Sequence, residues 1–427
     1  MGTRPTKNRS RTQVFSRVAG PAVFALVLLS PSSPTNAAGF YINSVGTPGS
    51  LGTAAAANVT NNWGPDATWA NPAGLVGIGD RRIMTAGLQA LIPVAEFDVS
   101  VAEADGDDGG NAGDPALIPS FFYSQRLDET WAFGFGVSAL QGGGVDYGNN
   151  FAGRYGAIDV KLTGLAATWS LGRQITDKLS IGFGGSVIQT DFEQTIAFNQ
   201  GPASDGRVAM RDLDDLGVQG IFGLQYAATE NLSLGLTYRS EFDAELKGNV
   251  EFKNFTLPVP DQRNLKVDWT NPQWIEAGLR MRLRGNRHLF LSGNWQEWSK
   301  FSSNQLAIDT NGGGIVQTLD RDWDDTWSLA VGYATGTTTS AGWSFGARYE
   351  SSPVDNDKRT IDLPVDETWQ LSAAYGRFRE DRSRGWSVGA TLALFGDAKV
   401  DQTVQGVRFA GDFDKYYVLF LGGTYRF

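Results

Sequence analysis

Large apolar side chains alternate with small or polar ones along most of the chain. Between residues 131 and 138, Trp131, Phe133, Phe135 and Val137 stand at the odd positions, and Ala, Gly or Ser at the even ones. A period of two places successive side chains on opposite faces of a β-strand. The pattern predicts strands with one bulky face and one face of small or polar side chains. The same alternation recurs in residues 179–184, 232–239, 343–349 and 386–390.

Fourteen segments of the chain alternate in this way. About 9 to 11 residues suffice for a tilted strand to cross a bilayer, and single-chain bacterial barrels have an even number of strands. Several segments begin with Trp and end with Tyr, and aromatic rings gather at both interfaces of a membrane. The pattern therefore predicts an all-β fold, a 14-stranded antiparallel transmembrane β-barrel. The segments are residues 82–100, 117–127, 131–140, 161–172, 179–192, 215–228, 231–246, 273–284, 288–297, 326–335, 342–350, 368–377, 385–396 and 415–427.

The last of these segments ends on Phe427. An alternating strand that closes on an aromatic residue is typical of the final strand of a bacterial outer-membrane barrel. We therefore expect the protein to lie in the bacterial outer membrane, and its last strand to be recognised by the outer-membrane assembly machinery.

Residues 1–37 have the composition of a secretory signal peptide. Five cations and no acid in residues 1–17 precede an apolar run over residues 18–29, and small side chains flank Asn36. The apolar run is too short to span a membrane as a helix, and no stretch of about 18 or more apolar residues follows it. We predict export and cleavage after Ala37; an uncleaved N-terminal anchor is the alternative.

Residues 38–80 are rich in Gly, Ala, Asn and Pro and lack the alternation. They precede the first predicted strand, and a barrel of fourteen strands encloses a lumen. The sequence thus predicts three parts: a signal peptide (1–37), a hatch that plugs the lumen (38–80) and the barrel itself (81–427).

Composition excludes several classes of function. The 427 residues include no Cys and one His, which excludes thiolate chemistry and sites built from several histidines. The 46 Asp and Glu outnumber the 36 Lys and Arg, and this acidic balance argues against a nucleic-acid partner. We expect no cofactor and no metal.

Two local features have an alternative chemical interpretation. Residues 98–114 hold six acids and no base, but Gly109 and Ala116 stand where a calcium loop needs oxygen ligands. The segment is predicted to be a solvated external loop, suited to divalent-bridged contact with lipopolysaccharide. His288 and Ser292 share a strand face, yet strand residues four apart are separated by about 13 Å, too far for a catalytic pair. We therefore do not expect an enzyme.

A series of short motifs runs through the chain from Ala38-Gly39-Phe40 to the end. The most distinctive is residues 66–75, Asp-Ala-Thr-Trp-Ala-Asn-Pro-Ala-Gly-Leu. In this order the motifs resemble those of the long-chain fatty-acid outer-membrane transporter family (FadL/TodX type). The others are residues 49–52, 153–155, 179–184, 238–240, 247–248, 298–301, 352–354 with Arg359 and Pro364, and 425–427.

The resemblance implies a monomer that takes up hydrophobic small molecules, long-chain fatty acids or hydrocarbons, by passive diffusion. Members of the family collect cargo in an extracellular groove between two long loops and pass it to an inner site against the hatch. They release it sideways through a gap made by an inward kink of the third strand. By resemblance, the loops would lie near residues 141–160 and 193–213, and the kinked strand near 131–140.

The hatch offers two candidate contacts with the cargo. Asn71-Pro72 is a turn signal, because proline presets its own backbone and restricts the residue before it. The turn Asn71-Pro72-Ala73 is either structural or, as the resemblance implies, adjacent to the ligand. Phe40 is either a frayed terminus or, again by resemblance, part of the inner site.

The wall offers further candidates. Arg239 and Arg348, like Arg426, fall on the small-residue face and point inward; a buried cation requires a partner, which is either a lumen carboxylate or a bound fatty-acid head group. Gly134 and Gly136 either permit the bend that a lateral gate requires or relieve crowding.

The cargo itself stays open. Fatty-acid-binding members of the family carry basic residues near the loop before the tenth strand, whereas residues 320–325 of this chain read Asp-Arg-Asp-Trp-Asp-Asp. Neutral hydrocarbons are therefore as compatible as fatty acids. A general porin for small polar solutes is the alternative function, and it would require an open, charge-lined lumen without a plug.

Overall fold

Within the described residues, nineteen strands form one antiparallel sheet. The computed structural model describes residue 1 and residues 41–78, 82–256, 259, 264–301, 303–309, 315–336, 341–379 and 384–427. The chain divides into two units, Met1–Ser33 and Pro34–Phe427, and the sheet belongs to the second. The predicted signal peptide beyond Met1, its cleavage site and Phe40 lie outside the described residues.

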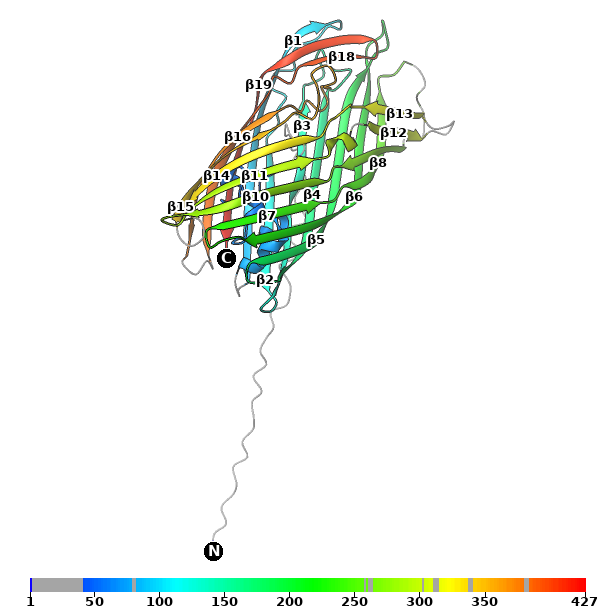
Figure 1. The fold of residues 1–427 in the computed structure, drawn as a ribbon. Helices are drawn as coiled ribbons and strands as arrows, with labels where there is room; N and C mark the ends of the chain where they lie inside the picture. The colour runs from blue at the N-terminus through cyan, green and yellow to red at the C-terminus, as the bar shows by residue number, and fades with distance from the viewer. Residues whose placement is uncertain are drawn as a thin grey trace. The chain divides into compact units, whose positions relative to one another are not determined.

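Fourteen of the strands close into a ring (Figure 1). Each pairs antiparallel with the next, and β19 pairs with β1. The predicted 14-stranded antiparallel barrel is confirmed, and each predicted segment overlaps one strand of the ring. These strands are β1 (Ile83–Ala102), β2 (Ala116–Arg126), β3 (Trp131–Asp146), β4 (Asp159–Gln174), β5 (Leu179–Phe198), β6 (Gly206–Ala227), β7 (Leu232–Arg239), β10 (Trp274–Leu283), β11 (Arg287–Gln296), β14 (Thr326–Thr335), β15 (Ala341–Glu350), β16 (Thr368–Phe378), β17 (Gly385–Phe395) and β19 (Val407–Arg426).

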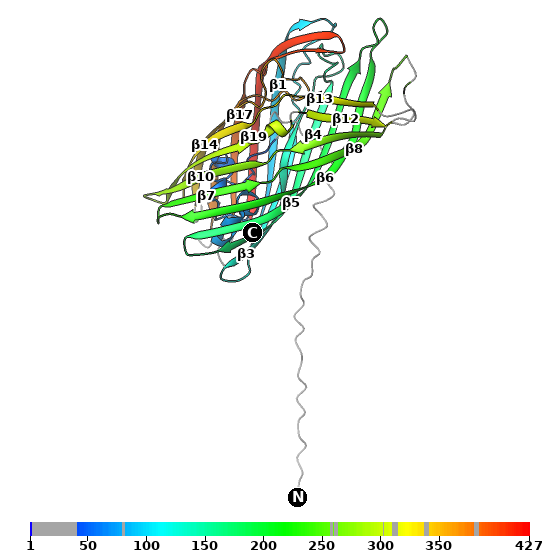
Figure 2. The same ribbon diagram turned by 45° about the vertical axis from the view of Figure 1, so that its right-hand side comes forward.

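Five further strands extend the sheet beyond the ring at the end opposite the C-terminus (Figure 2). They are β8 (Phe242–Lys253), β9 (Asn264–Asn271), β12 (Ser303–Asp309), β13 (Ile315–Asp320) and β18 (Val400–Val404). The sequence pattern placed β7 and β8 in one segment, residues 231–246. The ladder breaks between them at Ser240, whose hydroxyl accepts from the Gly220 N–H and whose own N–H donates to the Gly220 carbonyl.

The two ends of the ring differ in their connections. Short turns link β2 to β3, β4 to β5, β6 to β7 and β10 to β11 at the end near the C-terminus. The last of these turns, a three-residue loop, has positive φ at Gly285 (75°) and Asn286 (54°), a conformation that is common in tight hairpin turns. Long connections and the extra strands lie at the other end. We call these the turn end and the loop end.

The bulky face of the strands points outward. In β14, Trp327 and Leu329 are 48% and 61% exposed, whereas Ser328 and Ala330 between and after them are buried. Exposed aromatic rings contact one another near both ends of neighbouring strands: Trp327–Tyr349–Trp369 towards the loop end, and Trp343–Tyr375–Trp386 towards the turn end. Two aromatic belts around an apolar band are typical of transmembrane barrels.

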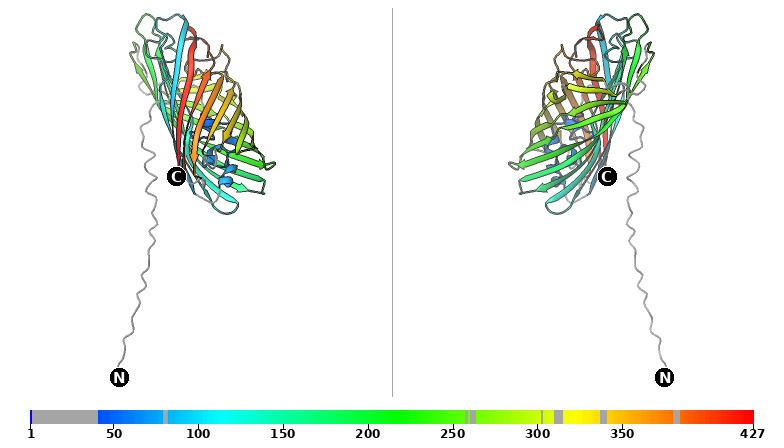
Figure 3. Two further views of the ribbon diagram at one scale, coloured as in Figure 1. Left: turned by 90° about the vertical axis from the view of Figure 1, so that its left-hand side faces the viewer. Right: turned by 90° about the vertical axis from the view of Figure 1, so that its right-hand side faces the viewer.

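The hatch, here residues 41–78, lies inside the ring (Figure 3). It contains η1 (Leu51–Thr53), η2 (Asn58–Thr60), α1 (Ala67–Ala70) and η3 (Pro72–Ile78). All the residues of η1, η2 and α1 are buried. The predicted plug in the lumen is therefore present. Among the described helices, none is long and apolar enough to cross a membrane.

Candidate functional site

The turn Asn71-Pro72-Ala73 joins the hatch to the wall. The Asn71 side-chain amide donates to the carbonyl oxygen of Val59 at 2.7 Å and to those of Leu224 and Leu236 at 3.2 Å. Its side-chain oxygen accepts from the Ala73 N–H at 3.1 Å. One fully buried side chain thus ties together η2, η3, β6 and β7. The turn does not line any of the three spaces described below.

Two lumen-facing glycines of the wall lie directly against the hatch. A Cβ added at Gly182 would lie 2.3 Å from the Ala73 nitrogen, and one at Gly134 would lie 2.0 Å from the Thr68 hydroxyl. At Gly136 the added atom would instead meet the Phe122 ring of the neighbouring strand at 2.6 Å. The space beside Gly134 and Gly182 is therefore filled by the hatch and is not open to cargo.

The largest of the three spaces is the lumen pocket, with about 800 Å³ of empty volume including its open mouth. It lies between the start of the hatch and the loop end of the strands. Its apolar lining residues, half of them aromatic, are Tyr41, Ile42, Trp298, Trp323, Pro353, Val365, Ala393, Phe395, Val418 and Phe420. Its polar lining residues are Asn43, Ser44, Thr326, Glu350, Ser351, Asp366, Thr368, Gln370 and Thr391.

Tyr41, the first described residue of the hatch, forms part of this pocket and part of the wall. Its ring contacts Trp274 and Trp298, with centroids 5.3 and 5.2 Å apart. Its backbone bridges to Gln141 of β3, and the N–H of the following residue, Ile42, donates to the Leu140 carbonyl at 2.9 Å. The hatch therefore begins as a short partner strand of β3.

β3 leaves its neighbour β2 at the same place. Their ladder starts at Ala132 and stops at Val137, and the register of β3 with β4 slips between Ala139 and Gln141, where Leu140 is an extra residue. From there on, within the described strands, β3 pairs with β4 and with the start of the hatch. The irregularity lies within the strand that was expected to kink, but beyond Gly134 and Gly136, which both keep regular partners in β2 and β4.

A second space, the wall pocket, lies beside the departing strand. It has about 480 Å³ of empty volume and is mostly apolar. Its lining comes from β1, the β1–β2 connection, β3, β4, β19 and the connection between β15 and β16: Pro93, Ala95, Gly113, Gly142, Gly143, Gly144, Val145, Leu162, Asp362, Leu363, Pro364, Val365 and Tyr416.

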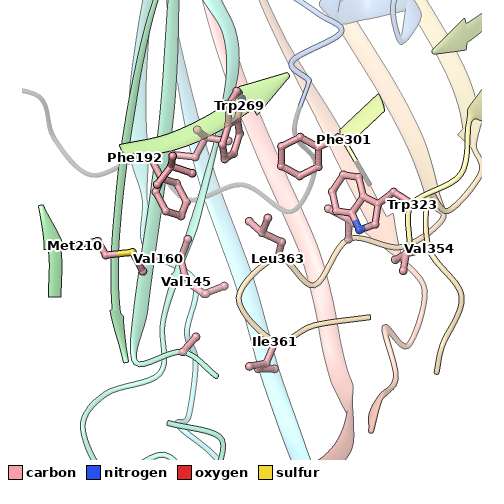
Figure 4. Packing of buried hydrophobic residues seen from close by; sticks show 14 of the residues in the cluster. Val145, Val160, Phe192, Met210, Trp269, Phe301, Trp323, Val354, Ile361 and Leu363 are labelled. Atoms are coloured by element: carbon pink, nitrogen blue, oxygen red, sulfur yellow. The ribbon is translucent and has the colours of Figure 1, made fainter. Parts of the chain in front are cut away.

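Residues 351–367, which connect β15 to β16, form an inserted segment between the two pockets. Val365 lines both of them. In Figure 4, Ile361 and Leu363 of this segment lie between Val145 on one side and Trp323 on the other. The segment thus belongs to the buried core of the loop half of the lumen and separates the lumen pocket from the wall pocket.

Two buried arginines hold the inserted segment. Arg359 donates to the carbonyls of Val365 (2.8 Å) and Lys399 (3.0 Å) and pairs with Asp366 at 2.9 Å. Burial lowers the pKa of Arg359. Arg321 pairs with Asp362 at 2.9 Å. Although burial raises the pKa of Asp362, the Arg321 charge and the hydrogen bonds from Arg321 and Thr360 together outweigh it and hold that pKa below its usual range.

Arg239 and Arg348 do point inward, as their strand positions predicted. They line a third and smaller space, the polar cavity, of about 260 Å³, together with Glu276. Arg239 donates to the Trp69 carbonyl of the hatch, and Arg348 pairs with Glu350 at 3.3 Å. Neither arginine lines the lumen pocket.

The two predicted loops contact each other at the loop end. Residues 141–160 contain the end of β3 and the start of β4, and residues 193–213 contain the β5–β6 hairpin. Arg154 of the first pairs with Asp205 of the second at 2.7 Å. The acids of residues 98–114 are largely exposed, and among the described residues no cluster of His, Cys, Asp or Glu could hold a metal ion.

Sequence reasoning missed four residues of the site. Tyr41 and Glu350 line the lumen pocket, and Arg321 and Asp362 hold the inserted segment. Glu350 ends a predicted strand, and its alternation could have indicated an inward carboxylate. The segment around Asp362 has no periodicity, so its burial carried no signal in the sequence.

Comparison with known proteins agrees with this geometry. Residues 28–427 match the family described as outer membrane protein transport protein (OMPP1/FadL/TodX). The long-chain fatty acid transport protein of Escherichia coli (strain K12) is 23% identical over 373 residues, which cover 78% of this chain and 79% of the relative. That of Escherichia coli O6:H1 is 26% identical over 356 residues, covering 73% and 78%.

Solved structures show the same fold. A FadL homologue from Pseudomonas aeruginosa superposes with a TM-score of 0.81 at 20% identity, over 91% of this chain and 99% of that one. The toluene transporter TodX of Pseudomonas putida superposes with a TM-score of 0.68 at 18% identity, over 91% and 98%. The match over nearly the whole chain, together with the plugged 14-stranded barrel, shows that this protein is an outer-membrane β-barrel that belongs to the OMPP1/FadL/TodX family.

Proposed function

We propose that the protein takes up hydrophobic small molecules across the outer membrane by passive diffusion, and that they leave sideways through the wall. One observation carries this proposal. The lumen pocket, which has many apolar lining residues, borders the start of the hatch. The apolar wall pocket borders the part of β3 that has departed from β2, and the two pockets share Val365.

The physical argument starts from the cargo. Apolar solutes partition poorly into water, so a hydrated, charged channel offers them no favourable path. The aromatic residues that line the lumen pocket would bury the apolar part of a ligand as the ligand leaves water. The hatch blocks a straight course towards the turn end, because η1 and α1 are buried against the wall. We therefore place the exit at the wall pocket.

The names of similar proteins support the same class of cargo. The relatives from Escherichia coli are named for long-chain fatty acids and the structural neighbour from Pseudomonas putida for toluene. Both ligands are hydrophobic, and they differ in charge. A general porin, the alternative, would need an open lumen, which the buried hatch argues against. We further propose that the protein works as a monomer, contacts outer-membrane lipid and lipopolysaccharide, and is not an enzyme.

Deletion of Leu140 tests the lateral route. Without the extra residue, β3 can continue its regular ladder, and the gap between β2 and β3 should close. A strain that lacks the wild-type gene and produces this variant should take up a labelled hydrocarbon or fatty acid much more slowly than one producing the wild-type protein. Deletion of Gly285, in the exposed β10–β11 turn at the turn end, is the control for shortening the chain. Unchanged uptake at equal outer-membrane abundance would contradict the lateral route.

A further inference from the structure

We propose that the lumen pocket selects uncharged hydrophobic molecules over carboxylate anions, and that Glu350 determines this preference. The inference rests on the proposed function, because it names the class of cargo for the same pocket. The similarity to fatty-acid transporters does not lead to this preference, because a fatty acid is a carboxylate anion at neutral pH.

The charges of the pocket are the first step. Among its lining residues that the structure describes, none is Lys, Arg or His, whereas Glu350 and Asp366 are both present. Their side chains are 20% and 12% exposed, so their carboxylates reach the edge of the space. A ligand in the pocket therefore meets negative charge and hydrogen-bond acceptors.

The two carboxylates differ in how far they are already satisfied. Asp366 pairs with Arg359, and its oxygens also accept from the N–H groups of Glu367 and Ala398. Glu350 uses a single oxygen, Oε2, to accept from Asn43 at 3.1 Å and from Arg348 at 3.3 Å. Its other oxygen has no hydrogen-bond partner among the described residues. Glu350 is therefore the carboxylate that a ligand would meet.

The arginine behind Glu350 does not reverse this charge. Arg348 lines the polar cavity with Arg239, Glu276 and Asn294 and is not among the residues that line the lumen pocket, whereas its partner Glu350 is. Two arginines and two glutamates form this group, so their formal charges cancel. A carboxylate head in the lumen pocket would lie closer to Glu350 than to Arg348. Because repulsion from Glu350 at about 5 Å exceeds the attraction to the more distant Arg348, an anion in this partly buried site should bind roughly tenfold more weakly.

The wall pocket repeats the arrangement. Its one described carboxylate, Asp362, already pairs with Arg321, and its lining includes no Lys, Arg or His among the described residues. Neither space on the proposed route therefore offers a base to an anion. A neutral molecule avoids this repulsion, and a head group that donates a hydrogen bond can use the free oxygen of Glu350.

Two ligands of equal shape test the inference. Dodecanoate and dodecanamide share one chain and a planar head, but only the first is charged at pH 8. Equilibrium binding of each tritiated compound to the purified full-length protein in detergent should show dodecanamide bound at least tenfold more tightly. Equal affinities, or tighter binding of dodecanoate, would overturn the inference and leave the transport proposal standing.

Variants locate the preference. Glu350→Gln removes the negative charge and exposes Arg348, so the affinity for dodecanoate should rise at least tenfold while that for dodecanamide changes less than twofold. Glu367→Gln removes an equal charge from the outer surface, where Glu367 accepts from the Tyr349 hydroxyl, and should leave the ratio unchanged. A similar rise in both variants would show that net charge, and not Glu350, sets the preference.

A second substitution guards against misfolding of the first. Gln370→Lys places a cation in the same pocket, opposite Arg348 on the neighbouring strand, and keeps both Arg348 and Glu350; it should also raise dodecanoate affinity at least tenfold. No gain in either folded variant would refute the role of the pocket's charge. If the wild-type protein bound neither ligand and took up no hydrophobic compound, the proposed function itself would fail.

Discussion

The two halves of the lumen are filled by different kinds of contact. In the turn half, the backbone of the hatch lies against glycines of the wall: a Cβ at Gly346 would lie 2.1 Å from the Thr53 carbonyl carbon, and one at Gly235 would lie 2.2 Å from the Val59 oxygen. In the loop half, side chains from strands and loops meet as aromatic pairs, such as Trp269 with Phe301 at 4.8 Å.

The difference indicates which half can change. Backbone-to-backbone contacts leave no freedom, since neither partner has a side chain that can rotate away. Ala54 and Ala55 even hold positive φ angles (51° and 66°), a conformation that costs roughly 1 to 2 kcal/mol per residue and persists only where its surroundings fix it. Side chains in the loop half can change rotamer around the two pockets. The hatch is thus a fixed floor, and the loop half is an adaptable chamber.

The largest expected effect comes from breaking the floor. Gly346→Val would drive a branched side chain into the Thr53 backbone, at a cost above the roughly 1 to 3 kcal/mol typical of overpacking, because backbone cannot rotate away. The hatch should be displaced, and single-channel recordings should change from little steady ion current to a large one. Gly293→Val, whose nearest neighbour is a Leu329 side-chain carbon at 3.4 Å, is the matched control. A closed channel in both variants would show that the floor is not held at Gly346.

A smaller effect should follow from loosening the chamber. Arg321→Met leaves Asp362 buried and unpaired, which costs about 3 to 5 kcal/mol. The inserted segment should then become sensitive to protease added from outside the cell, while the ion current stays low. Lys358→Met removes an exposed pair with Asp322 and should not change cleavage. Restored resistance in the double variant Arg321→Met, Asp362→Leu would confirm that the unpaired charge, and not the lost side chain, is responsible.

The smallest effect is expected from removing Asn71, the side chain that hydrogen-bonds both the hatch and the wall. Asn71→Ala would leave up to three carbonyl oxygens without their donor, at a cost of roughly 1 to 3 kcal/mol. All fourteen strands remain intact, so outer-membrane abundance should stay near that of the wild type, while uptake of a hydrophobic probe changes. Asn231→Ala, in the exposed β6–β7 turn, provides the control. Unaltered uptake at equal abundance would mean that the hatch is only a passive filler.

The sequence predicted the strands of the barrel wall more completely than the residues of the candidate site. The period of two is a local property, and it located every strand of the ring because outward bulk and inward smallness repeat along each one. The plug was also predictable, since residues 38–80 lack that alternation. The inserted segment was not, because Asp362 is buried by a contact with Arg321 that lies 41 positions away. The extra residue at Leu140 is visible only once β3 is aligned with β4.

The seam between β1 and β19 has a consequence for assembly. The N–H of Phe427 donates to the Met84 carbonyl at 3.0 Å, and the N–H of Met84 donates to the Phe427 carbonyl at 3.3 Å. One edge of β1 therefore stays unpaired until β19, the last strand, is in place. Closure of the ring is then a slow, long-range step during which β1 can pair with a wrong strand. Because the hatch precedes every strand that touches it, the wall can be laid down around it. Insertion through a finished rim is then unnecessary, and the plug is available as a template before the ring is sealed.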